Sequence, residues 1–350
     1  MIPVTDYDLP TDEARKAGEE LLSRGKVACL VLAGGQGTRL AATHPKALTP
    51  VTPIRQKTLL QIFCERGRAA AQAYESHLPI AVMTSSENHE TIDNYLKQND
   101  HFGVSDLSLF QQRNTPFLTE DRQGRVGEGP NGNGEALQLL CQSGIAEKWR
   151  KQGIESVIVL PIDNPLADPF DATLCGFHEM QANEATLKTI LRTDPQEKVG
   201  VVVKKEGRIG VQEYSELPAH FEAPIAHIGL FCLSLSWVET IRDCELPWHY
   251  AYKKYQNQII WKPERFLFDV LSFADRVGVV VYPRDEVYAP LKNARGDKSL
   301  ATVQQALLAF DRKLLQQWDE PIPDCFELDP SIYYLREKSQ KISNYILKMS

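Results

Sequence analysis

Residues 27–46 read VACLVLAGGQGTRLAATHPK, and the rest of the chain can be interpreted from them. The apolar run 27–32 is short enough to be a buried strand. It is followed by three glycines within four positions: Gly34, Gly35 and Gly37. Such a turn lets backbone N–H groups close around an anion, and Arg39 and Lys46 add the two side-chain types that hold phosphate. The pattern predicts a phosphate-binding loop at the carboxyl end of the first strand of an open α/β sheet.

The spacing of this loop separates it from two common phosphate-binding motifs. No Gly-Lys-Ser/Thr follows a four-residue gap, so it is not the loop of the P-loop nucleotide hydrolases. Leu40 stands where the third glycine of a dinucleotide-binding fingerprint should fall. From the residues alone, a glycine-rich turn that binds no ligand stays open as an alternative.

Composition narrows the class of protein. The 350 residues are 43% apolar and 24% charged, which is typical of a soluble globular protein. A net charge of −7 argues against a nucleic-acid surface, and no apolar run is long enough to cross a membrane. Residues 1–18 lack the apolar core of a signal peptide, and the seven cysteines form no CxxC pair. We therefore expect a cytoplasmic protein with reduced thiols, binding neither nucleic acid nor membrane.

Apolar periodicity predicts alternating strands and helices along the first half of the chain. A helical pattern over 58–74 precedes a buried strand at 78–84, and Ser85 and Ser86 can cap the next helix, which runs to about 99. Further strands are predicted at 107–110 and 156–160. This alternation indicates a doubly wound, mostly parallel, Rossmann-like sheet.

Three units follow from this pattern. We expect a short N-terminal helical arm over 1–25, a catalytic domain over 26–297 and a C-terminal helical tail over 298–350. The catalytic domain divides into a nucleotide half, about 26–184, and a β-rich half, about 185–297, where the strands become shorter and a Gly207 turn indicates a hairpin. In the tail, one helix is expected from Ser299 and a second from Pro330 to the end.

The wording LAGGQGTRL followed by HPK resembles the signature of nucleotidyltransferases that make nucleotide sugars, and within them the eukaryotic-type UDP-N-acetylhexosamine pyrophosphorylases. Ala41 and Ala47 depart from the family's wording. The resemblance extends over about 27–297. It implies that the backbone of the loop binds nucleotide at five positions: Leu32, Ala33, Gly34, Gly35 and Gly37.

A second glycine-rich stretch, GEGPNGNGE at 127–135, is predicted to be a loop pressed against something flat. A mobile surface turn is the alternative. In the resembling family a Pro-x-Gly-Asn-Gly-Gly segment faces the uracil, and here Glu135 replaces the last glycine. The resemblance implies that Gly132 and Asn133 hold the base and that Gln111, at another strand end, reads it. An amide suits a uracil edge that offers a donor and acceptors.

The predicted strand 156–160 ends in PIDNP, which places Asp163 just beyond a central strand. Mg²⁺ commonly takes one or two protein carboxylates and completes its shell with phosphate oxygens and water, so one carboxylate is adequate. Asp-Asn-Pro is also an ordinary turn sequence. Because related enzymes have a similar Val-Asp-Asn at this point, Asp163 is predicted to be the Mg²⁺ ligand.

The segment 199–217, VGVVVKKEGRIGVQEYSEL, is close to a family segment in order and spacing. The resemblance implies that Gly200 and Glu213 contact the sugar, although a buried Glu213 paired with a basic core residue is an alternative. Further on, His227 falls near a sugar-contacting asparagine of the family. A histidine at a strand start can equally be structural, and the change puts an N-acetyl preference in doubt.

Two later segments complete the predicted site. ERFLFDVLSFADRV, 264–277, has the spacing of an amphipathic helix, and the resemblance places Phe266 and Phe268 beside the sugar's acyl group, where they could otherwise be core residues. Residues 290–294, PLKNA, match a family segment whose lysine, here Lys292, reaches the α-phosphate.

These residues predict a Mg²⁺-assisted uridylyltransferase that makes a UDP-sugar and pyrophosphate from UTP and a sugar 1-phosphate, with N-acetylglucosamine 1-phosphate as the first candidate. Arg39, Lys46 and Lys292 would offset charge in an in-line attack on the α-phosphate. Three alternatives remain: a UDP-glucose or broad-specificity UDP-sugar pyrophosphorylase, a non-catalytic binder of nucleotide sugars, and a dinucleotide-dependent oxidoreductase.

Overall fold

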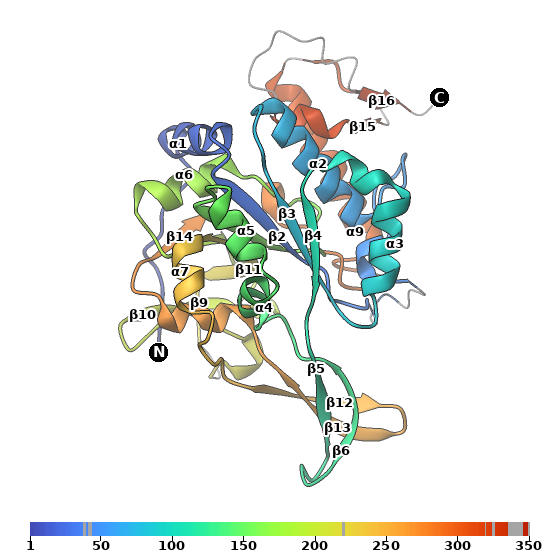
Figure 1. Cartoon of the computed structure of the whole chain (residues 1–350), viewed down its shortest axis with the longest axis vertical. Helices are drawn as coiled ribbons and strands as arrows, with labels where there is room; N and C mark the ends of the chain where they lie inside the picture. Colours follow the sequence, from blue (N-terminus) through green and yellow to red (C-terminus); the bar gives the residue numbers. More distant parts are fainter. Residues whose placement is uncertain are drawn as a thin grey trace.

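Figure 1 shows the computed structural model, which describes residues 1–37, 40, 44–218, 221–318, 320–323 and 326–334 and the backbone of 346–348. These residues form a ten-stranded sheet flanked by helices and a separate four-stranded sheet. The strands of the large sheet are β1 (Ile2–Pro3), β2 (Val27–Leu32), β3 (Ile80–Thr84), β4 (Leu107–Gln111), β7 (Ser156–Pro161), β8 (Ala185–Leu191), β9 (Val201–Lys205), β10 (Arg208–Gln212), β11 (Ile225–Ser234) and β14 (Val277–Val281). In the described part, no helix is long and apolar enough to cross a membrane.

The nucleotide half contains the parallel strands β7, β2, β3 and β4, in that spatial order. All six residues of β2 are buried, and they alternate between two hydrophobic cores. Cys29 and Val31 face the core shared with α2 (Leu59–Ala73), α3 (His89–Gln98), α6 (Ala172–Met180) and α9 (Leu300–Gln317). Ala28 and Leu30 face the core shared with α4 (Ala136–Gln142), α5 (Ile145–Lys151) and α7 (Leu235–Thr240). A strand buried on both faces by helices confirms the doubly wound α/β prediction.

The second half of the large sheet is mixed. β11 runs antiparallel to both β7 and β8, and β8 pairs in parallel with β14. The register of β11 against β8 shifts between His227 and Leu230, where Gly229 has a φ of 80°. Beyond this bulge β11 meets β9, which pairs with β10 and with β1. The bulge therefore separates the part of β11 that pairs with β7 from the part that meets β9.

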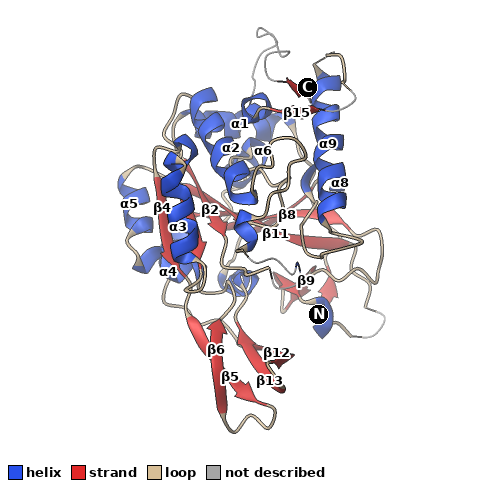
Figure 2. Cartoon of the chain, turned by 90° about the vertical axis from the view of Figure 1, so that its right-hand side faces the viewer, coloured by secondary structure: helices blue, strands red, loops and turns tan. Residues whose placement is uncertain are grey.

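The small sheet extends away from the body in Figure 2 and was not anticipated from the sequence. Its order is β12 (His249–Tyr255), β13 (Gln258–Glu264), β5 (Asn114–Thr119) and β6 (Arg125–Pro130), all antiparallel. The prediction of a loop over 127–135 is therefore wrong for its first part, because residues up to Pro130 belong to β6. Pairing with β5 satisfies the backbone of a stretch whose glycines suggested no regular structure.

The prediction of an amphipathic helix over 264–277 is also wrong. β13 continues to Glu264, Phe266 is extended, and only a 3-10 helix, η5 (Leu267–Phe273), follows. The side chain of Asn133 accepts a hydrogen bond from the N–H of Leu267 at 3.0 Å, which fixes the start of η5. The apolar spacing suggested a longer helix, but these long-range contacts determine the backbone path.

The N-terminal segment is packed onto the catalytic body. α1 (Asp12–Ser23) crosses α6 so closely that a Cβ at Gly18 would lie 1.7 Å from the carbonyl oxygen of Ala172. A Cβ at Gly176 would lie 1.8 Å from the carbonyl oxygen of Ala14. Before α1, Asp8 exchanges backbone hydrogen bonds with Val279 and Val281 of β14. The predicted N-terminal helix is present as α1. Contacts with β9, β14 and α6 hold the N-terminal segment in place.

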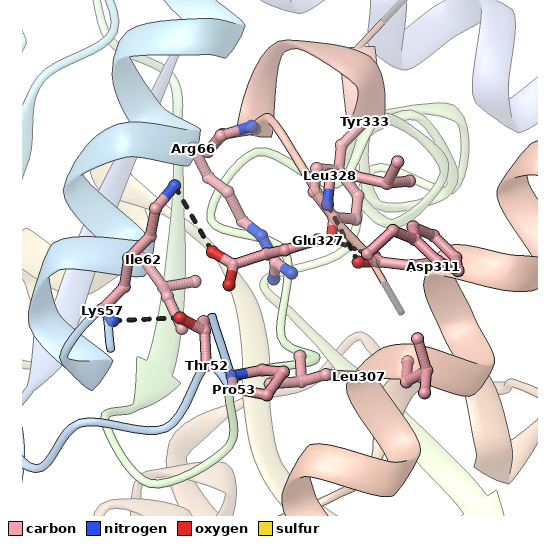
Figure 3. A pocket seen from close by; sticks show the side chains of 13 residues that line it. Thr52, Pro53, Lys57, Ile62, Arg66, Leu307, Asp311, Glu327, Leu328 and Tyr333 are labelled. Carbon is pink, nitrogen blue, oxygen red and sulfur yellow. Dashed lines mark hydrogen bonds and ion pairs between the residues drawn. The ribbon is translucent and has the colours of Figure 1, made fainter. Parts of the chain in front are cut away.

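The helix predicted from Ser299 is confirmed as α9. The prediction of a second helix from Pro330 to the end is wrong within the described residues. Pro330–Tyr334 form a 3-10 helix, η6, and β15 (Phe326–Leu328) pairs with β16 (Ile346–Lys348). Residues 335–345 and 349–350 lie outside the described residues. Glu327 of β15 accepts hydrogen bonds from the N–H groups of Ile54 and Arg55 at 3.3 and 3.0 Å. Figure 3 shows Glu327 beside Lys57 and Arg66, so the C-terminal segment supports the loop that precedes α2.

Four short helices complete the described chain. They are η2 (Lys46–Leu48), η3 (Asp100–Gly103), η4 (Tyr214–Glu216) and α8 (Arg284–Val287). η2 and η4 matter for the site, because each presents a charged residue beside the carboxyl edge of the sheet.

Candidate active site

The carboxyl ends of β2, β3 and β7 meet directly beneath the glycine-rich loop. The N–H of Ala33 donates to the carbonyl of Met83 at 2.7 Å, and the amide of Asn88 donates to the carbonyl of Ala33 at 2.9 Å. The N–H of Ile162 donates to Leu32 at 3.1 Å. These contacts place the loop at the edge where open α/β sheets bind ligands. The residues predicted to bind nucleotide through their backbone lie there: Leu32, Ala33, Gly34, Gly35 and Gly37.

Lys46 and Asp163 lie together at this edge. Lys46 Nζ is 3.4 Å from Asp163 Oδ2, and the two side chains are 16% and 18% exposed. Gly37, with a φ of 68°, packs against Lys46, since a Cβ there would lie 3.3 Å from that of Lys46. The third predicted cation of this region, Arg39, lies outside the described residues. A cation and a carboxylate are therefore held close to the loop backbone.

The segment carrying Lys292 is attached to the same strand end. The N–H of Leu291 donates to the backbone oxygen of Asp163 at 2.7 Å. The side chain of Asn164 donates to Val287 at 2.7 Å and accepts from the N–H of Ala289 at 3.0 Å. These hydrogen bonds bring Lys292 next to Asp163 although they are far apart in the chain.

Glu213 and Gly200 lie close to each other. A Cβ at Gly200 would lie 3.9 Å from Glu213 Oε1. Burial raises the pKa of Glu213 above its ordinary value, and the positive charge of Lys292 opposes that rise. The charge of Lys292 thus acts on Glu213, so a predicted phosphate contact lies close to a predicted sugar contact.

His227 is joined to this group through its backbone. Its N–H donates to the carbonyl of Gly200 at 2.9 Å, and its ring lies 4.6 Å from that of Phe231. Nδ1 is buried and has no hydrogen-bond partner in the described residues. Burial lowers the pKa of His227 to about 3, so the imidazole is neutral at physiological pH.

The predicted base-binding turn is fixed to the segment that follows β13. The N–H of Gly134 donates to the carbonyl of Arg265 at 2.9 Å, and a Cβ at Gly132 would lie 2.3 Å from that oxygen. Arg265 also donates to Glu135 at 2.9 Å. With its side-chain oxygen engaged by Leu267, Asn133 anchors the two segments to each other. The glycines are needed here because another backbone approaches closely.

The two neighbouring glutamines at the end of β4 have opposite environments. Gln111 is exposed, whereas Gln112 is 7% exposed and its amide covers the glycine-rich loop. A Cβ at Gly34 would lie 2.5 Å from Gln112 Nε2. Gln111 was predicted to read the base, and Gln112 was not predicted to take part. The sequence shows both glutamines, but which side chain turns toward the loop depends on where β4 ends.

Phe266 and Phe268 form a stacked pair with ring centroids 5.2 Å apart, and both are half-buried. His249, at the start of β12, packs against them with centroid distances of 4.8 and 6.2 Å. His249 was not among the predicted site residues, because nothing in the local sequence indicates that β12 would reach the phenylalanine pair.

An open α/β sheet with a glycine-rich turn, a lysine and an aspartate at its strand ends is characteristic of a nucleotide-binding enzyme. A sequence profile described as UTP--glucose-1-phosphate uridylyltransferase matches residues 3–231, and the chain belongs to this family of UTP:sugar-1-phosphate uridylyltransferases.

Relatives and solved structures agree with this assignment. Human UDP-N-acetylhexosamine pyrophosphorylase-like protein 1 is 33% identical over 341 residues, which cover 85% of this chain and 67% of that protein. A probable UDP-N-acetylglucosamine pyrophosphorylase of Encephalitozoon cuniculi is 29% identical, with coverage of 85% and 90%. The crystal structure of a putative UDP-N-acetylglucosamine pyrophosphorylase from Entamoeba histolytica has a TM-score of 0.80 at 28% identity, covering 90% of this chain and 89% of that one. The chain thus spans about two thirds of the human relative and most of the two shorter proteins.

Proposed function

We propose that the chain transfers the uridylyl group of UTP to N-acetylglucosamine 1-phosphate and releases pyrophosphate. The observation that carries the proposal is the contact between Lys46 and Asp163 at 3.4 Å, with the backbone next to Lys292 held at the same strand end by the bond from Leu291 to Asp163. Charged groups gathered at the strand ends suit a reaction in which two phosphates must approach each other. The names of the relatives support N-acetylglucosamine 1-phosphate as the acceptor.

In this proposal the protein acts chiefly by positioning and by neutralising charge. Lys46 and Lys292 offset negative charge on the α-phosphate and the incoming sugar phosphate, and the loop N–H groups and Arg39 hold the departing pyrophosphate. The sugar phosphate oxygen attacks in line and needs no general base, because it is already ionised. The Gly34 loop, with Gln112 over it, and the turn at Gly132 form the nucleotide side.

The residues also fit a bound Mg²⁺. The described residues contain no group of three His, Cys, Asp or Glu side chains that could form a protein-only metal cage. Asp163 is partly exposed beside the predicted phosphate position, which suits an ion held mainly by nucleotide oxygens. When bound, such an ion would supply positive charge that offsets the negative charge of the phosphates. Asp163 would hold the ion, and the ion pair between Lys46 and Asp163 keeps this carboxylate at the strand end.

On the sugar side, Gly200, Glu213 and the Phe266–Phe268 pair are proposed to face the hexose. Glu213 would accept hydrogen bonds from sugar hydroxyl groups, and the phenylalanines would cover an apolar substituent. A second candidate, UDP-glucose or broad-specificity UDP-sugar synthesis, is favoured by His227, a neutral imidazole near the position where the family has an asparagine.

Pyrophosphate release from UTP tests the proposal. The purified chain is assayed with N-acetylglucosamine, N-acetylgalactosamine, glucose and galactose 1-phosphates in turn, with Mg²⁺ present. We expect the highest kcat/KM with N-acetylglucosamine 1-phosphate. A higher value with glucose or galactose 1-phosphate would support the second candidate. UTP binding without pyrophosphate release in the presence of any of these sugar 1-phosphates would contradict both candidates and indicate a non-catalytic binder.

A further inference from the structure

His249 lies between two carboxylates that belong to the short helices η4 and η5. Its Nδ1 is 2.8 Å from Glu216 Oε1, and its Nε2 is 2.8 Å from Asp269 Oδ2. Glu216 is the last residue of η4, three residues after Glu213, and Asp269 belongs to η5, directly after Phe266 and Phe268. One imidazole from the small sheet thus joins two segments of the large domain.

The two bonds determine the charge of the ring. An ionised carboxylate only accepts hydrogen bonds, whereas a neutral imidazole has one N–H to donate, so both contacts call for the imidazolium form while Glu216 and Asp269 are ionised. The His249 side chain is 17% exposed. Burial alone would lower the pKa of His249, but the hydrogen bonds and charges of Glu216 and Asp269 outweigh burial and raise the pKa above its ordinary 6.5.

Other charged groups around the ring do not compete for it. Glu216 also accepts from the amide of Gln212, which in turn accepts from Lys205. Burial raises the pKa of Asp269, and the positive charge of Lys205 opposes that rise. The charges of Lys292 and His249 oppose the same effect of burial at Glu213. On β13, the register partner of His249 is Glu264, which is paired with Lys253 and Lys262. The imidazolium is therefore the cation that bridges Glu216 and Asp269.

We propose that His249 is a positioning residue of the sugar site, whose protonated ring ties the Glu213 segment to the phenylalanine pair and fixes the space between them. This inference rests on the proposed function. His249 does not touch the reacting phosphates. Loss of its proton would remove one of the two bonds and leave a nitrogen lone pair facing a carboxylate. Binding of the sugar 1-phosphate would weaken, while UTP binding and kcat at saturation would be preserved.

The test separates the KM values of the two substrates across pH. For wild type, we expect the KM for the sugar 1-phosphate to rise about tenfold from about pH 6 to about pH 9, equivalent to about 1.4 kcal/mol. The KM for UTP should stay within about twofold over that range. His249→Gln should show the raised KM at every pH. The control, His77→Gln, removes an exposed histidine that also pairs with a carboxylate, Asp106, and should follow the wild-type curve.

Two further measurements keep the result decisive. Glu216→Gln removes one carboxylate and leaves the histidine, so it should flatten the pH dependence even if His249→Gln fails to fold. Nitrogen NMR of the His249 ring should show both nitrogens protonated at neutral pH. A neutral ring, or a wild-type KM for the sugar that is constant with pH, overturns the inference. Absence of UDP-sugar formation by wild type overturns the proposed function instead, and the NMR measurement still tests the imidazolium bridge.

Discussion

At the scale of single residues, one step at the end of β4 separates an exposed side chain from one that covers the glycine-rich loop. Gln111 pairs with Thr84 at the end of the strand, and the N–H of Gln112 donates to Thr84 at 2.8 Å beyond it. Because successive side chains of a strand point to opposite faces, neighbouring glutamines cannot share a role. Of these two glutamines, Gln112 is the one that lies against Gly34.

This contrast gives a matched pair of variants. Gln112→Ala should raise the KM for UTP by about tenfold, as expected for loss of a buried polar contact worth about 1.4 kcal/mol. Gln111→Ala should leave the KM for UTP within about twofold, because an exposed side chain contributes little. Pyrophosphate release at varied UTP measures both. A larger increase in the KM for UTP with Gln111→Ala than with Gln112→Ala would instead indicate that Gln111 contacts the base, as the resemblance alone implies.

Buried histidines make stability depend on pH. His178 bonds to Thr186 and Ser234 at 2.9 and 3.0 Å, and burial lowers its pKa from 6.5 to about 4. Between these pH values His178 is protonated in the unfolded chain but not in the folded chain. Its contribution to stability is therefore fully present above about pH 6.5 and decreases as the pH falls. Replacing His178 by Gln should reduce the pH slope of the unfolding free energy by about 1.4 kcal/mol per pH unit between these values.

Urea unfolding of wild type and His178→Gln at several pH values from neutral to acidic measures this slope. Each protein serves as its own reference, because the comparison is between slopes and does not depend on absolute stability. Parallel lines for the two proteins would show that His178 is protonated equally in the folded and unfolded chains.

At the scale of elements, the packing of α1 on α6 depends on the absence of two Cβ atoms. Gly18→Ala should reduce the free energy of unfolding by about 1–3 kcal/mol or more, because the new methyl group would meet backbone and cannot be relieved by a rotamer change. Gly210→Ala is the control, since a Cβ there meets nothing within 4 Å. Denaturant unfolding measures both, and equal stabilities would mean that the helix crossing is looser than described.

Elements were predictable where burial imposes a clear periodicity. The strand at 27–32 and the helix from 59 to 73 have strong apolar patterns, and the structure confirms both. The small sheet was missed because β6 reads RVGEGP and β12 is largely exposed, so neither shows a core face. The helix predicted over 264–277 failed because the spacing of its apolar residues is shared by a 3-10 segment whose path is fixed by Asn133.

At the scale of the whole molecule, the site is assembled from loops that the sequence separates widely. The motifs identified Lys46, Asp163 and Lys292 individually through their resemblance to a family. What the sequence could not provide is the set of contacts that joins them, such as Leu291 to Asp163 and Asn164 to Ala289, because long-range hydrogen bonds have no local signature. The same holds for His249, which reaches the sugar half only through the small sheet.

The central claim is that cations converge on phosphate at the carboxyl edge of the sheet. It is tested most directly by the kcat of Lys46→Ala for UDP-sugar formation from UTP and sugar 1-phosphate, both saturating. Lys148→Ala, which removes a half-exposed lysine paired with Asp106, is the control. We predict that Lys46→Ala lowers kcat by about 10²–10³, the usual effect of losing one preorganised charge, with the control unchanged. A correctly folded Lys46→Ala protein with near wild-type kcat would contradict the account.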